Sequence, residues 1–163
     1  MLPNFKWPKP EDARDDKLIR DIINHKCQII SIPEDKHGPA YSFSVGLYLH
    51  FMHPEIVIFS LQPKTAAITI NNICRLIQQG RRFQHGDTVH DLFDTVDVAM
   101  IDVDRRCYGY FLGTALWFYR SINEEFPTLQ LVWPDKHGNL PWDETVNPQV
   151  KQMQPLLGTF RHP

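Results

Sequence analysis

The stretch that decides the fold covers residues 41–61 and reads YSFSVGLYLHFMHPEIVIFSL. Its first residues alternate between large apolar and small side chains, which is typical of a strand with one buried face. From Glu55 to Leu61 the residues are apolar almost throughout, which is typical of a strand covered on both faces. We interpret the apolar but irregular segment 47–53 as a connector between these two strands.

Another strand is predicted just upstream of this stretch. Residues 27–32 form a short, β-branched run that ends at Pro33. Turn-forming residues at 34–38 separate this run from the strand at 41–45, so we predict that the two strands pair as a hairpin. Before them, apolar residues at helical spacing indicate an amphipathic helix over residues 11–25.

Helices and strands alternate downstream. Pro63 is typical of the first turn of a helix, and Gly80 of its end. The polar segment 81–94 is interpreted as a loop with room for one short strand. Strands are then predicted at 96–103 and 129–133, and a short helix within 148–157.

The segment 108–119 is predicted to be a helix. It carries no charge between Arg106 and Arg120, so we expect it to be the most buried element of the fold. Gly109 and Gly113 share one face of this helix, and we interpret them as positions of close packing on the sheet.

These elements give the order α-β-β-β-α-β-α-β. We predict an α+β fold with a mixed, mostly antiparallel sheet of about five strands and packed helices. Residues 1–10 are expected to form an extended, proline-rich lead-in, and residues 11–163 a single domain. The tetrapeptide Asp-Lys-His-Gly occurs at 35–38 and at 135–138; we interpret both copies as tight turns with positive φ at Gly38 and Gly138.

Composition limits the class of protein. With 163 residues, a net charge of −2 and 12% aromatic residues, the chain is neither disordered nor basic enough for a typical nucleic-acid binder. The three cysteines, Cys27, Cys74 and Cys107, are far apart in sequence, which argues against a disulfide scaffold. The first residues include no apolar signal region, and the helix at 108–119 is too short to cross a membrane. We expect a cytoplasmic protein.

Two motifs resemble a known family. The first is Tyr41 to Leu47, followed by His53-Pro54-Glu55 and an apolar strand; the second is Gln130 to Asp135, followed by Gly138 and Pro141-Trp142. Both, in this order, resemble the bacterial family catalogued as domain of unknown function 4262, over roughly residues 15–157. The resemblance implies no activity and assigns no catalytic residue.

A few residues could carry chemistry. His50, His53 and Glu55 combine imidazole and carboxylate groups that suit a metal, although we favour the simpler interpretation of a strand entry with an ordinary edge carboxylate. Cys107 follows Arg105 and Arg106, which would favour its thiolate unless the thiol is buried. We predict no bound metal and no cofactor.

Trp133 and Trp142 flank the turn at 135–138, and each is adjacent to a proline, Pro134 or Pro141, on the side of the turn. They could form a wall for a planar ligand or a partner's side chain, or cover the end of the sheet as a structural staple. We predict one shared binding surface made of the segments 46–53 and 133–142. The candidate binding residues are Tyr41, His50, His53, Glu55, Trp133, Asp135 and Trp142.

Three functions follow as hypotheses. The first is a protein-binding or interaction module, similar to immunity proteins, with a protein partner and no nucleic acid or membrane. The second is a small metal- or histidine-dependent enzyme that uses His50, His53 and Glu55. The third is a small-molecule sensor with a pocket between the meander of the first three strands and the helix that carries Gly109 and Gly113.

Overall fold

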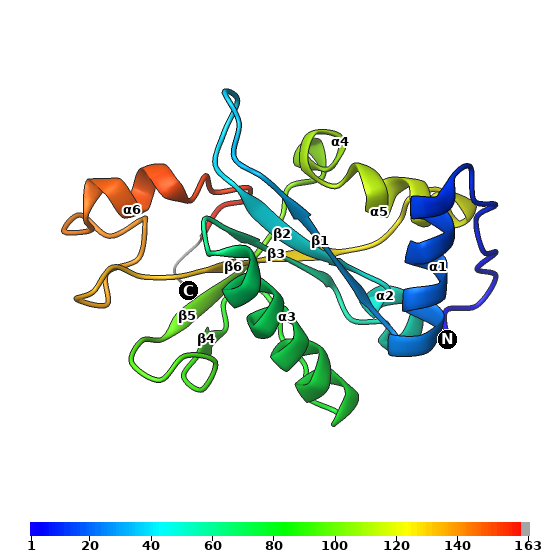
Figure 1. Cartoon of the computed structure of the whole chain (residues 1–163). Coiled ribbons are helices and arrows are strands. Elements are labelled where there is room, and N and C mark those ends of the chain that lie inside the picture. Colours follow the sequence, from blue (N-terminus) through cyan, green and yellow to red (C-terminus); the bar gives the residue numbers. More distant parts are fainter. Residues whose placement is uncertain (161–163) are drawn as a thin grey trace.

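The structure is a computed structural model that describes residues 1–160. Within these residues a six-stranded sheet has the order β1-β2-β3-β6-β5-β4 (Figure 1). Its strands are β1 (Gln28–Ile32), β2 (Tyr41–Val45), β3 (Glu55–Phe59), β4 (Thr88–Val89), β5 (Val98–Asp102) and β6 (Thr128–Val132). The α+β class and the mixed sheet are confirmed; the sixth strand is the two-residue β4, in the loop segment 81–94 where the sequence leaves room for one short strand.

The pairing is antiparallel except between β3 and β6. β1, β2 and β3 form an antiparallel meander, with Ile30 opposite Phe43, so the predicted hairpin is confirmed. β6 pairs parallel to β3, with Glu55 opposite Thr128, and antiparallel to β5. The sheet is therefore mostly antiparallel, and β6 joins its two halves.

Helices cover both faces of the sheet. They are α1 (Ala13–His25), α2 (Leu47–Phe51), α3 (Pro63–Gln78), α4 (Tyr108–Phe111), α5 (Gly113–Phe118) and α6 (Pro148–Met153), with single 3₁₀ turns at Arg105–Cys107 and Arg120–Ile122. The Asp12 side chain begins α1 by accepting hydrogen bonds from the N–H groups of Arg14 and Asp15. No helix in the described part of the chain is long and apolar enough to span a membrane.

Two apolar cores result from the alternation of side chains along the strands. Phe43 and Phe59 pack on one face of the sheet with α1, α4 and α5. Ile56 and Ile58 pack on the opposite face with α3. The lead-in has no helix or strand, and its Phe5 ring packs on Phe118 with centroids 5.2 Å apart.

The expectation for segment 108–119 is wrong in two respects. The helix is interrupted at Leu112, where φ is −119° and ψ is 34°, and it is not the most buried element, because every residue of β3 and β6 is buried. Tyr110 is 67% exposed. An uncharged face can be exposed where its residues are glycine and tyrosine, because glycine presents no apolar side chain and tyrosine keeps a polar hydroxyl.

The expected roles of the glycines are also partly wrong. Gly109 and Gly113 are exposed, and a Cβ at either would meet no atom within 4 Å. A Cβ on Gly158 would instead lie 1.8 Å from the Asp102 carbonyl oxygen. Gly138 has a φ of +87°, as predicted, but Gly38 has no positive φ, because the residue before a proline avoids helical conformations.

Candidate functional site

Glu55, the strongest candidate for chemistry in the sequence, lies in a closed hydrogen-bond network. It is the first residue of β3 and is 0% exposed. Its Oε2 accepts a hydrogen bond from the Ser44 hydroxyl at 2.5 Å, and its Oε1 accepts from the N–H groups of Gly46 at 2.9 Å and Tyr48 at 3.1 Å. The Tyr119 hydroxyl also donates to Oε1. Since Gly46 and Tyr48 begin α2, Glu55 supplies acceptors to the first turn of that helix.

The carboxylate is held away from solvent. Burial raises the pKa of Glu55, and the hydrogen bonds from Ser44 and Tyr119 oppose this in part. Burial and the adjacent carboxylate also raise the pKa of Tyr119. None of the four cavities described below is lined by Glu55. Its geometry is that of a structural anchor between β2, α2 and β3.

His53 is engaged by the backbone at both ring nitrogens. Its Nδ1 lies 2.7 Å from the Pro54 carbonyl oxygen, to which it donates, and its Nε2 accepts from the Phe83 N–H at 3.0 Å. Because Nε2 accepts from an N–H, it carries no proton and the ring is neutral; burial favours this state by lowering the pKa of His53. Neither nitrogen is free for a metal or a substrate.

His50 does not complete a metal site with these residues. Its Nε2 is buried without a hydrogen-bond partner in the described chain, and burial lowers its pKa. Within residues 1–160, no three or more His, Cys, Asp or Glu side chains are placed to hold a metal. The enzyme hypothesis therefore finds no set of free ligands in this part of the chain.

Asp135 organises the turn that follows β6. Its Oδ1 accepts from the N–H groups of His137 at 2.8 Å and Asn139 at 3.0 Å, and its Oδ2 accepts from the Asn147 N–H at 3.0 Å. Burial raises the pKa of Asp135, but the hydrogen bonds from Asn139, Asn147 and His137 outweigh it and lower the pKa to about 2. Both oxygens of the Asp135 carboxylate therefore accept hydrogen bonds from the loop that follows β6.

The two tryptophans around this turn are held by the protein itself. Trp133 donates its indole N–H to the Phe59 carbonyl at 2.9 Å. The side chain of Gln154 pairs with the backbone N–H and C=O of Trp133 at 3.0 and 2.7 Å. Trp142 stacks on Phe160, with ring centroids 4.3 Å apart. Both indoles are half-buried, and these contacts match the structural staple.

The predicted shared surface is wrong, because the two segments lie at opposite ends of the sheet. Glu55 at the start of β3 pairs with Thr128 at the start of β6, whereas Trp133 follows the other end of β6 and bonds Phe59 at the end of β3. The parallel pairing of β3 and β6 causes this separation. His50, His53 and Glu55 therefore lie far from Trp133, Asp135 and Trp142 along the strands.

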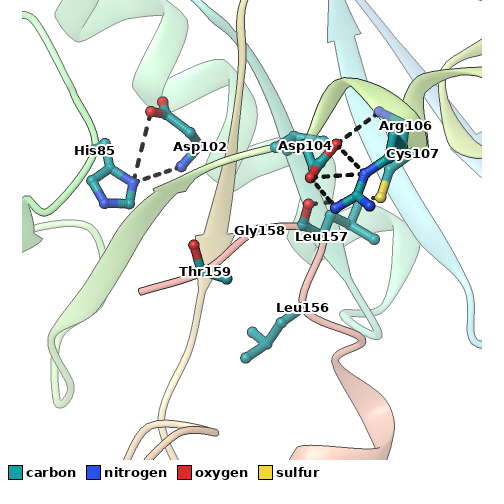
Figure 2. Close-up of a pocket in the computed structure, with 10 residues that line it drawn as sticks. His85, Asp102, Asp104, Arg106, Cys107, Leu156, Leu157, Gly158 and Thr159 are labelled. Atoms are coloured by element: carbon teal, nitrogen blue, oxygen red, sulfur yellow. Dashed lines mark hydrogen bonds and ion pairs between the residues drawn. The ribbon is translucent and has the colours of Figure 1, made fainter. Parts of the chain in front are cut away.

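An open cavity of about 640 Å³ lies between the end of β5 and the last described residues (Figure 2). It contains histidine, acidic and thiol groups, a set that could serve catalysis. Its lining residues are His85, Asp102, Val103, Asp104, Arg106, Cys107 and residues 156–159.

The polar groups of this cavity are paired in ways that do not build a catalytic dyad. The Nδ1 of His85 accepts from the Asp102 N–H at 2.9 Å, and the Cys107 thiol donates to the Leu157 carbonyl at 3.6 Å (Figure 2). Burial raises the pKa of Cys107. Burial and the charge of Asp104 outweigh the opposite effect of Arg106 on this pKa, and the Arg106 guanidinium is itself bound to Asp104.

The remaining cavities gather around the β1–β2 hairpin, which projects from the sheet (Figure 1). The tyrosine cleft, of about 210 Å³, is lined by Ile32, Pro33, Asp35, His37, Gly38, Pro39, Tyr41, Tyr110 and Phe111. The proline cleft, of about 190 Å³, is lined by Ser31, Ile32, Pro33, Ala40, Tyr41, Ser42, Leu61 and Pro63. A shallower hollow of about 710 Å³ continues toward α6.

The two clefts lie on opposite faces of the hairpin. Residues of α4 line the tyrosine cleft, and the start of α3 lines the proline cleft, and these helices cover opposite faces of the sheet. Each cleft is smaller than the roughly 300–1,000 Å³ of a small-molecule site. They have the size for single side chains.

The strand between the clefts, β1, is an edge of the sheet. It pairs only with β2, and no other part of residues 1–160 hydrogen-bonds to its backbone. Its sequence, QIISI, carries no charge. An uncharged edge strand with free N–H and C=O groups is a template for pairing with another chain.

Sequence reasoning found only part of this candidate site. Tyr41 was a predicted binding residue and lines both clefts. Tyr110 and Phe111 were assigned to a buried helix, although Tyr110 is exposed. The missed signal was the absence of charge in β1, which is unusual for an edge strand.

The described residues form an α+β domain with an open mixed sheet, an unpaired edge flanked by small clefts, and candidate catalytic groups engaged in structural hydrogen bonds. The chain belongs to the family described as Domain of unknown function (DUF4262), whose model matches residues 21–147. No curated protein and no solved structure matches the chain. Ser44, Gly46, His53, Glu55 and Asp135, from the two recognised motifs, all serve the structural networks described above.

Proposed function

We propose that this protein is an interaction module that binds an extended segment of a partner protein along β1. The observation that carries the proposal is the free, uncharged edge of β1 between two side-chain-sized clefts. An added strand obtains affinity from main-chain hydrogen bonds and specificity from pockets that receive alternate side chains. This arrangement supports strand addition better than catalysis.

The clefts and the loop define the chemistry of the partner segment. Tyr41 and Phe111, with ring centroids 5.4 Å apart, form an aromatic wall in the tyrosine cleft, so an apolar or aromatic side chain is preferred there. Glu34 and Asp35 are exposed beside it, and the chain carries a net charge of −2. A partner with apolar residues at alternate positions and a flanking Lys or Arg is the best match.

The proposed setting is the bacterial cytoplasm. Three free cysteines support a reducing compartment. The protein would then act as immunity proteins do: a small, mildly acidic module would bind a basic partner protein and add no chemistry of its own.

Selection from a displayed library of short peptides tests the proposal. We expect the wild type to enrich peptides with alternating apolar residues, and Tyr110→Ala to bind them at least tenfold more weakly. Met52→Ala is the matched control. Met52 is 61% exposed, but it follows α2, at the end of β2 that lies away from the two clefts. Hydrogen exchange of residues 28–32 should slow when the peptide is bound.

Two results would overturn the proposal. One is that the selected peptides slow hydrogen exchange only around the cavity lined by His85 and Cys107 and not along β1. The other is a β1 edge that is occupied by a second copy of the chain, which analytical ultracentrifugation would detect as a dimer that Ser31→Lys dissociates.

A further inference from the structure

Two cysteines that are far apart in sequence meet in the core. Cys27 lies between α1 and β1, and Cys74 lies in the fourth turn of α3. Their Sγ atoms are in direct contact, 2.7 Å apart, although 47 positions of sequence separate the two residues. Both residues are buried, at 6% and 4% exposed, and both are free thiols.

The surroundings of the pair are apolar. The residues that pack in the same core include Leu47, Ile56 and Ile70. The hydrogen bond from Cys27 and burial raise the pKa of Cys74, so this thiol is protonated at rest. The third cysteine, Cys107, belongs to the core on the opposite face of the sheet and donates to the Leu157 carbonyl.

We propose that Cys27 and Cys74 are a modification site that forms a reversible intramolecular disulfide on exposure to a peroxide. In the first step, local opening of the core admits hydrogen peroxide; one thiol loses its proton, and its sulfur takes an oxygen from the peroxide to give a sulfenic acid and water. In the second, the other sulfur attacks the sulfenic sulfur, forms the S–S bond and releases a second water. The two thiols lose two electrons and the peroxide gains them. The sulfurs need to approach by less than about 1 Å to reach bonding distance.

The disulfide would close a loop that contains β1, β2, α2, β3 and most of α3. It would therefore link the start of the edge strand β1 covalently to α3, the helix that packs on Ile56 and Ile58. Because a cross-link restricts the unfolded chain more than the folded one, the oxidised form is the more stable form. A thiol donor such as glutathione reverses the reaction by exchange.

The test is thiol counting by mass spectrometry on the full chain. Reduced protein, unfolded and alkylated with iodoacetamide, should carry three alkyl groups, since the sequence has three cysteines. After mild hydrogen peroxide treatment we expect one alkyl group, on Cys107, and a tryptic species that joins the Cys27 peptide to the Cys74 peptide. Dithiothreitol should restore three.

Matched variants separate this pair from other oxidation. Cys107→Ser should still form the cross-linked peptide, and Cys74→Ala and Cys27→Ala should each abolish it. Peroxide should raise the melting temperature of the wild type and of Cys107→Ser. The proposal is overturned if all three thiols of the peroxide-treated wild type remain alkylatable, or if the loss of thiols is confined to Cys107.

Discussion

Replacement of Glu55 by alanine is the sharpest test of the view that this carboxylate is structural. The change removes the acceptor of the Ser44 and Tyr119 hydroxyls and of the Tyr48 N–H. The Gly46 N–H keeps an alternative acceptor, the Tyr119 hydroxyl oxygen at 3.2 Å. Three buried donors are therefore left without a partner.

The magnitude follows from these contacts. Each unsatisfied donor costs about 1–3 kcal/mol, and loss of the carboxylate's own desolvation offsets part of the sum. We expect Glu55→Ala to lower the free energy of unfolding by about 4 kcal/mol. Since domains are stable by about 5–15 kcal/mol, this variant should be close to unfolding at physiological temperature.

Glu55→Gln should be much milder. The carboxamide oxygen can still accept from Gly46, Tyr48 and Tyr119, and its NH₂ can donate to the Ser44 oxygen, which has a lone pair left beside the Ile56 N–H bond. We expect a loss of about 1–2 kcal/mol. A proton-transfer role would not separate the two variants, because glutamine and alanine both remove the ionisable group.

Urea unfolding followed by tryptophan fluorescence measures both variants. Glu144→Ala, at an exposed position, is the control and should change the free energy of unfolding by less than about 0.5 kcal/mol. The reasoning is refuted if Glu55→Ala is within 1 kcal/mol of the wild type, or if the Gln and Ala variants are equally unstable.

Three further predictions concern stability. Gly158→Ala should lower the free energy of unfolding by at least about 2 kcal/mol, because the new Cβ would meet the Asp102 carbonyl. Gly109→Ala should be neutral or stabilising by up to about 1 kcal/mol, and equal melting temperatures of the two variants would contradict this. Leu131→Ala, in fully buried β6, should cost about 2–5 kcal/mol, and Leu116→Ala, half-buried, less than about 2 kcal/mol in the same urea assay. Asp135 has a folded pKa of about 2, below the unfolded value, so its contribution to the free energy of unfolding is present above about pH 4 and is lost as the pH falls to about 2. The difference in melting temperature between the wild type and Asp135→Asn should therefore narrow from pH 6 to pH 2.5. A difference that stays constant over this range would exclude the linkage.

Local pattern predicted the fold where neighbouring residues decide the structure. The alternation in residues 41–45 and the turn residues at 34–38 were sufficient for the hairpin. The interruption at Leu112 was missed because the apolar spacing continues across it. The place of β6 between β3 and β5 was also missed, since a parallel pair between distant segments leaves no signal in either one alone.

The site was harder to predict than the fold. Glu55 and His53 are residue types that suit catalysis, and only the positions of Ser44, Tyr119 and Phe83 reveal their structural use. The contact of Cys27 with Cys74 depends on how α3 packs on the sheet, which spacing does not encode. Strand alternation predicted Tyr41 in β2, where it lines both clefts; its role in binding stays a prediction.

The position of β6 has a consequence for synthesis of the chain. β3 is complete once residue 59 has been made, but its parallel neighbour ends at residue 132. At ribosomal rates of about 5–20 residues per second, the inner edge of β3 waits roughly 4–15 s for its partner. During that interval the inner edge of β3, which is apolar from Ile56 to Phe59, is exposed on the nascent chain, and chaperones that hold extended apolar segments would find their substrate there.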